Sequence, residues 1–118
     1  MANPNIRNLT SLVGNTAVAI ATTSYATLVS NSAGSNTIVK VVSMNFANVV
    51  SSPVSVYAKI VRSSTDYIYI NNITVPANSS FAAIGKDAPL YLLEGDTLQI
   101  YASANSSIHV ISSNEVIA

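Results

Sequence analysis

The sequence lacks cysteine and tryptophan altogether, and it contains few charged residues. The absence of cysteine excludes disulfides, thiolate metal ligands and cysteine nucleophiles. Charged residues make up 8% of the 118 positions, with five basic side chains balancing five acidic ones, whereas about 25% is usual. Nucleic-acid binding normally needs a basic stripe that neutralises phosphates. No such cluster occurs, so we expect no nucleic-acid partner.

With so few charges, the polar surface must consist mainly of serine, threonine and asparagine. Such a surface costs little to desolvate against a partner protein. The composition therefore favours a subunit of an assembly. It fits equally well any β-rich extracellular or virion protein.

Long hydrophobic runs are also missing. No stretch approaches the ~18 uninterrupted apolar residues of a membrane span. The segment "LTSLVGNTAVAIATTSYA" is interrupted by Asn15, Thr16, Thr22 and Thr23, which argues against a signal peptide. We expect neither a membrane segment nor a signal peptide, and the length is that of one domain.

From residue 16 onward the apolar residues recur with a period close to two, which indicates half-buried β-strands. Residues 1–15 show no periodicity and are predicted to form an extended N-terminal arm that orders only where something holds it. Residues 16–118 are predicted to form a single all-β domain, an antiparallel β-sandwich of jelly-roll or immunoglobulin-like topology with seven to eight strands. The expected strands span residues 16–30 (as one strand or two separated near Ser24), 37–48, 54–62, 67–75, 81–84, 90–93, 97–103 and 108–117.

Alternation also predicts which side chains face the core. In the second strand, Ile38, Val42, Met44 and Phe46 are expected to point inward. Lys40 has the same phase, so either the strand begins after it or a bulge shifts the register. Gly34, in the preceding turn, is free to adopt positive φ.

The stretch "EGDTLQIYASANSSIHVISSNEV" raises the question of a site. Glu94 and Asp96 could act as an acid–base pair or bind calcium, but turn chemistry is the simpler explanation. Gly95 then adopts unusual backbone angles, and Asp96 bonds back to main-chain amides. We predict a closing hairpin with its turn at residues 104–107. Its core contacts are expected to be Leu98, Ile100, Ile108 and Val110.

His109 is the only histidine, and it is out of phase with its buried neighbours. A single histidine forms no metal cluster, so we expect it to face solvent or an interface. The sequence has no G-x-S-x-G elbow and no Gly-rich phosphate loop. We therefore expect no enzyme, no catalytic residue, no metal, no cofactor and no small-molecule substrate.

Tyrosine is the informative aromatic residue. Tyr57, Tyr67, Tyr69 and Tyr101 alternate with aliphatic residues, so they are predicted to lie on the outer face of the sheet. Such a face suits a protein interface, and simple cross-strand pairing explains it as well. Sugar stacking is a third interpretation, ranked behind both because tryptophan is absent.

Three segments resemble a family of small β-sandwich proteins encoded by tailed bacteriophages, especially cyanophages. They are "TIVKVVSMNFANVVSSPVSVYAKIV", "YIYINNITVPANSS" and "PLYLLEGDTLQIYASANSSIHVISSNEV", and the resemblance covers roughly residues 36 to 117. The shared motifs are strands and their turns. The resemblance implies a virion structural protein and transfers no catalytic residue.

The resemblance implies a capsid cement (decoration) protein, expected to be a homotrimer on the capsid surface at local three-fold axes, with the major capsid protein as partner. The alternatives are a small tail, neck or fibre-base component of the virion and, from another class, a carbohydrate-binding module. In the cement hypothesis the arm reaches a neighbouring chain, which costs entropy but adds reach. The candidate interface residues are Asn5, Ile6, Arg7, Leu9, Tyr57, Tyr67, Tyr69, Tyr101 and His109.

Overall fold

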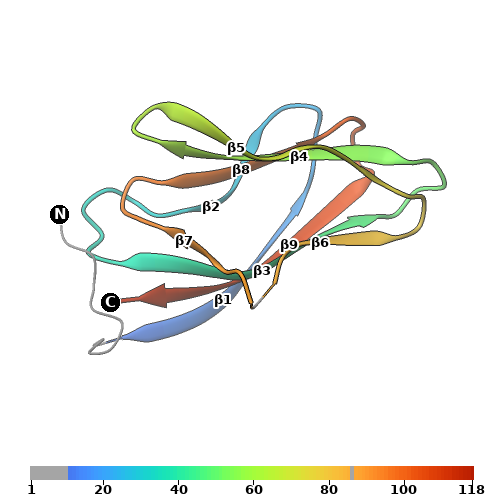
Figure 1. The fold of residues 1–118 in the computed structure, drawn as a ribbon. Coiled ribbons are helices and arrows are strands. Elements are labelled where there is room, and N and C mark those ends of the chain that lie inside the picture. Colours follow the sequence, from blue (N-terminus) through green and yellow to red (C-terminus); the bar gives the residue numbers. More distant parts are fainter. Residues whose placement is uncertain (1–10, 86) are drawn as a thin grey trace.

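A computed structural model describes residues 11–85 and 87–118, which form nine β-strands and no helix (Figure 1). Among these residues there is accordingly no helix of the length and hydropathy that crossing a membrane requires. The strands are β1 (Leu12–Ile20), β2 (Ala26–Ser30), β3 (Ile38–Asn48), β4 (Val54–Arg62), β5 (Thr65–Val75), β6 (Ser80–Ile84), β7 (Leu90–Leu92), β8 (Thr97–Ala102) and β9 (Ile108–Ile117).

The strands form two antiparallel sheets that pack face to face (Figure 1). One sheet has the order β1-β9-β3-β6, with β7 also paired to β3, and the other has the order β2-β8-β4-β5. The pairs β1·β9, β2·β8, β3·β6/β7 and β4·β5 are those of one long hairpin rolled up on itself, which is a jelly roll. The predicted all-β sandwich is confirmed, with nine strands rather than seven to eight.

The core lies between the sheets and follows the predicted alternation. Phe46, Met44 and Leu92 are among its largest fully buried side chains. The expected core contacts Leu98, Ile100, Ile108 and Val110 are all at most 1% exposed. Period-two patterning therefore identified most of the inward faces, because each face of a strand repeats every second residue.

The prediction for Val42 is wrong. Val41 is fully buried and Val42 only partly so, because the pairing of β3 with β9 shifts register between Val41 and Ser43. This β-bulge inverts the phase within the strand. Lys40 therefore faces outward and pairs loosely with Glu115, at 4.0 Å, which is the second of the two explanations considered for it.

The predicted closing hairpin is also wrong. β8 pairs with β2 and β4, whereas β9 pairs with β1 and β3. Residues 103–107 thus cross from one sheet to the other. A sandwich needs such crossings, and the local sequence of a crossing loop resembles that of a hairpin turn.

The boundary of the arm differs as well. Residues 12–15 belong to β1 and pair with residues 114–117 of β9, so they are part of the domain. β9 holds them in place through backbone hydrogen bonds. Residues 1–10 lie outside the described residues, and with them the interface candidates Asn5, Ile6, Arg7 and Leu9.

Candidate interaction surfaces

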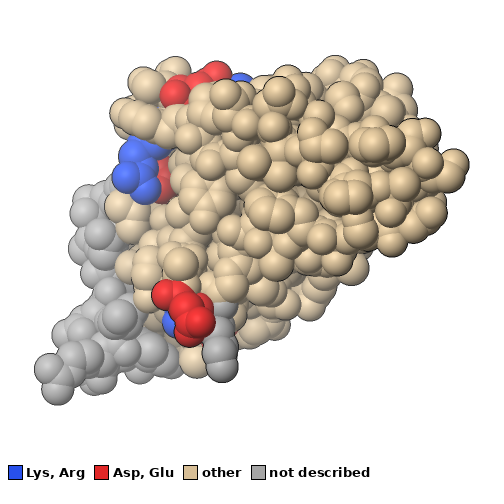
Figure 2. Space-filling view, turned by 45° about the vertical axis from the view of Figure 1, so that its right-hand side comes forward, with Lys and Arg blue, Asp and Glu red and all other residues tan. Residues whose placement is uncertain are grey.

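Within residues 11–85 and 87–118, the loops at one end of the sandwich contain no charged residue. Hydrogen bonds join its four loops, including one from the Thr23 amide to Asn105 Oδ1 at 2.9 Å. Figure 2 shows a broad uncharged surface, with acidic and basic side chains confined to one side of the view. We call this region the uncharged end, and it consists of residues 21–25, 49–53, 76–79 and 103–107.

An apolar patch lies on the outer face of the β1 sheet, next to the uncharged end. Val18 pairs directly with Ile111, and Ile20 pairs with His109. Val18 is 71% exposed, Ile20 57% and Ile111 48%, and they line a shallow depression together with His109. His109 is exposed, as predicted for a solvent-facing side chain. Apolar side chains gathered in this way on an exposed face mark interaction sites more often than scattered ones do.

The same patch borders the sheet edge that β1 forms among the described strands. β1 is the outermost strand of its sheet, and no described strand pairs with its free side. Its nine residues, "LVGNTAVAI", include no charged residue and no proline. Monomeric proteins usually protect such an edge with charge, proline or a bulge, because unpaired backbone groups are a template for another chain. The edge and the apolar patch therefore form one candidate docking region.

Two of the predicted interface tyrosines do meet on the outer face of the other sheet. Tyr57 and Tyr101 pair across β4 and β8, with ring centroids 4.2 Å apart and planes within 7°. The edge of Tyr25 packs against Tyr101 at 4.4 Å, and Lys59 Nζ lies 4.1 Å from the centre of the Tyr25 ring. These tyrosines contact one another, so cross-strand pairing accounts for this tyrosine stack.

The tyrosine stack should make stability sensitive to alkaline pH. Desolvation raises the pKa of Tyr101, with smaller contributions from Tyr57 and Tyr25. Burial also raises the pKa of Tyr25, and this effect exceeds the lowering of that pKa by the positive charge of Lys59. A raised folded-state pKa gives stability that is complete below the unfolded pKa of about 10 and is lost as pH rises through the folded value. Urea unfolding across this range should show that loss, and Tyr101→Phe should reduce it. An identical pH profile in the variant would contradict the assignment.

Tyr67 and Tyr69 do not join this stack. The register of β4 and β5 places Tyr67 opposite Ile60, on the inward-facing side, and Ile68 opposite Lys59, on the outer side. Ile68 pairs with Lys59 and Ile70 pairs with Ala58, so Tyr69 between them has no partner residue in β4 and forms a β-bulge. The prediction that Tyr67 shares the outer face with Tyr57 is therefore wrong, because register shifts in β5 break the alternation.

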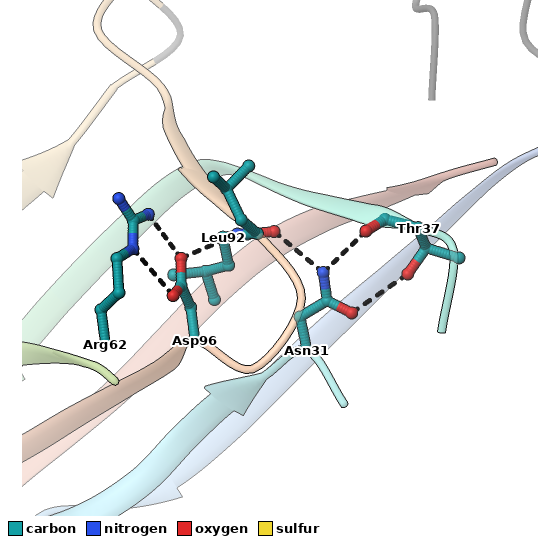
Figure 3. A network of polar contacts seen from close by, with 6 residues as sticks. Asn31, Thr37, Arg62, Leu92 and Asp96 are labelled. Atoms are coloured by element: carbon teal, nitrogen blue, oxygen red, sulfur yellow. Dashed lines mark hydrogen bonds and ion pairs between the residues drawn. The ribbon is translucent and has the colours of Figure 1, made fainter. Parts of the chain in front are cut away.

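The other end of the sandwich is held by charged residues (Figure 3). Asp96 is 1% exposed and accepts hydrogen bonds from Arg62 Nε at 2.9 Å, Arg62 Nη2 at 2.5 Å and the Leu93 amide at 2.8 Å. The hydrogen bond to Asp96 raises the pKa of Arg62 above its ordinary value. Gly95 has φ of 85°, so the predicted turn chemistry of Gly95 and Asp96 is confirmed.

Glu94 and Asn31 stabilise the loop between β2 and β3. The Glu94 carboxylate accepts hydrogen bonds from the amides of Gly34 (2.9 Å) and Asn36 (3.0 Å). Buried Asn31 donates to the carbonyls of Thr37 and Leu92, at 2.9 and 3.0 Å (Figure 3). Glu94 and Asp96 thus both stabilise turns, as the turn-chemistry explanation predicts.

No group of three or more histidine, aspartate or glutamate side chains within residues 11–85 and 87–118 is placed to hold a metal ion. Val18, Ile20 and Ile111 are not recognisable as surface residues from the sequence, because each looks like an ordinary member of an alternating strand. Their significance depends on the sheet order, which leaves β1 at an edge.

The chain matches no protein-family model and no curated protein. The phage resemblance of the three quoted segments therefore stays a prediction. What the chain does must be argued from the surfaces described above.

Proposed function

We propose that the protein is a structural protein of a phage virion, a capsid cement protein that stabilises contacts between major capsid protein subunits. The observation that carries this proposal is the uncharged end together with the adjoining apolar patch and the free edge of β1. The choice of a virion rests on the sequence resemblance. Neither line of support involves catalysis, and the proposed role is not enzymatic.

The physical argument concerns the cost of docking. Burying a charged group without a partner is expensive, whereas serine and asparagine side chains are desolvated more cheaply and readily find hydrogen bonds. Exposed Val18, Ile20 and Ile111 add apolar area that gains from burial. A surface of this kind can adhere to a neighbouring subunit without a highly specific charge pattern.

The proposed assembly is a homotrimer that contacts several capsid subunits at once. Each contact can then be weak, because the effective concentration of the second and third contacts is high once the first has formed. The free edge of β1 provides backbone donors and acceptors that a neighbouring strand can pair with. The tail, neck or fibre-base alternative uses the same surfaces and differs in the number of copies per particle.

The test is addition of the purified protein to phage heads that lack it, followed by gel densitometry of the bound copies. We expect saturable binding at a fixed ratio to the major capsid protein, and heads that withstand a higher temperature. Absence from heads combined with a few copies on tails would instead support the tail alternative and overturn the cement proposal.

The arm is tested by a deletion of residues 1–10. The deletion must stop there, because residues 12–15 pair with β9 inside the domain. We expect an unchanged melting temperature and weaker binding to heads. Full binding by the truncated protein would exclude the arm from the interface and leave the apolar patch as the contact.

A further inference from the structure

A crevice opens at the charged end, between the β4–β5 hairpin of one sheet and β7 of the other. Its volume is about 430 Å³, which lies within the ~300–1,000 Å³ of small-molecule sites. We call it the hairpin crevice. It is lined by Ile60, Arg62, Tyr67, Leu90 and Tyr91.

Arg62 is the fixed polar group of this crevice. Its Nε and Nη2 atoms are both bonded to Asp96, which is buried and also bound to the Leu93 amide. Two parallel hydrogen bonds hold the guanidinium plane in one orientation. Among the described residues no acceptor is paired with its Nη1 atom, and the side chain is 47% exposed. Arg62 therefore presents oriented donors to whatever enters the crevice.

The ion pair also determines the charge of the crevice. The Asp96 carboxylate largely offsets the Arg62 charge, so an anionic ligand gains little net attraction. A wholly apolar ligand would cover the guanidinium donors without bonding them, which costs free energy. An uncharged ligand with both apolar and hydrogen-bonding faces fits both constraints.

The remaining lining residues match such a ligand. Tyr67 is 58% exposed and Tyr91 39%, so both aromatic side chains are accessible, and each combines an apolar ring with a hydroxyl that donates and accepts. Ile60 and Leu90 are partly buried against the core. A sugar ring offers C–H groups to aromatic and aliphatic surfaces and hydroxyls to Arg62 and the tyrosines.

We propose that the hairpin crevice binds a neutral sugar ring, with Arg62 donating to sugar hydroxyls and Tyr67 and Tyr91 contacting the ring. This site shares only Tyr67 with the tyrosines that the sequence predicts on the outer face; Tyr57 and Tyr101 lie elsewhere and stack on each other. It lies at the end opposite the uncharged end. Sugar binding there is independent of capsid binding, and each can fail without the other.

The test is an amide NMR titration with glucose, galactose, mannose and N-acetylglucosamine, and with glucuronate as the anionic comparison. We expect at least one neutral sugar to shift the amides of residues 60–62, 67 and 90–91, with a Kd of about 1 mM. Tyr67→Ala and Tyr91→Ala should each weaken that binding about tenfold. Tyr69→Ala is the matched control from the same strand, and it should leave binding unchanged.

Four results would overturn the proposal. The first is the absence of localised shifts with every neutral sugar. The second is binding of glucuronate alone, which would show that the Arg62 charge remains available. The third is an equal loss of sugar binding in the Tyr69→Ala control. The fourth is a shift of these amides by a short leucine-containing peptide when none of the sugars shifts them. Unchanged melting temperatures of the variants exclude unfolding as the cause of any loss.

Discussion

Val18→Lys is expected to weaken binding of the protein to its assembly partner by at least about a hundredfold while leaving the fold intact. Val18 is 71% exposed in the apolar patch, and it lies on β1, which has a described partner strand on one side only. A lysine there would have to be desolvated without a partner, and a loss of ~2.7 kcal/mol corresponds to a hundredfold change in Kd. Stability should change by no more than ~0.5 kcal/mol, since the site is exposed.

The matched control is Ile68→Lys. Like Val18, Ile68 is an exposed apolar residue in a strand, with 57% of its surface accessible. It lies opposite Lys59 on the outer face of the other sheet. We expect this variant to bind like the wild type. Light scattering for self-association and densitometry for head binding provide the measurements. Equal self-association and equal head binding of the two lysine variants would show that the apolar patch is not part of the interface.

Asp96→Ala is expected to lower the free energy of unfolding by about 3 kcal/mol, a large part of the ~5–15 kcal/mol typical of a domain. The substitution removes two hydrogen bonds to Arg62 and one to the Leu93 amide. It also leaves a gap at a position that is 1% exposed. Part of the cost is offset because Arg62 can be solvated, its side chain being 47% exposed.

Asp66→Ala is the control for this effect. Asp66 forms an ion pair with Lys59 at 2.8 Å, but its side chain is 52% exposed. Exposed pairs contribute little, and the variant should lose no more than ~1 kcal/mol. Urea unfolding of both variants measures the difference. Similar losses for the two would mean that burial of Asp96 does not determine its contribution.

Local features of the fold could be predicted from the sequence. Strands were found where apolar residues alternate, and core positions such as Phe46 and Leu98 followed from the same period. The turn at Gly95 was found because glycine tolerates positive φ and aspartate bonds to nearby amides. Each of these features is determined by residues only a few positions apart.

Non-local features could not be predicted in the same way. Bulges in β3 and β5 reversed the faces assigned to Val42 and Tyr67, and nothing in the local pattern marks where a bulge falls. The contact between Arg62 and Asp96 joins positions 34 residues apart. Such pairs emerge only when the sheet order is known.

The candidate interface likewise has a local feature that the sequence predicts and a non-local one that it does not. The sequence revealed that charge is scarce, which favoured an assembly subunit. It could not show that residues 21–25, 49–53, 76–79 and 103–107 meet at one end, because hydrogen bonds across the sandwich bring them together. Segregation of charge along the long axis is thus a property of the topology.

The central claim is that the uncharged end, the apolar patch and the edge of β1 form an assembly surface. Its most direct test is the mass of the purified protein in solution. Light scattering at several concentrations should give three times the 12.3 kDa of one chain. The Val18→Lys variant should shift the distribution toward single chains. A mass of one chain at every concentration, in the wild type as in the variant, would contradict the account.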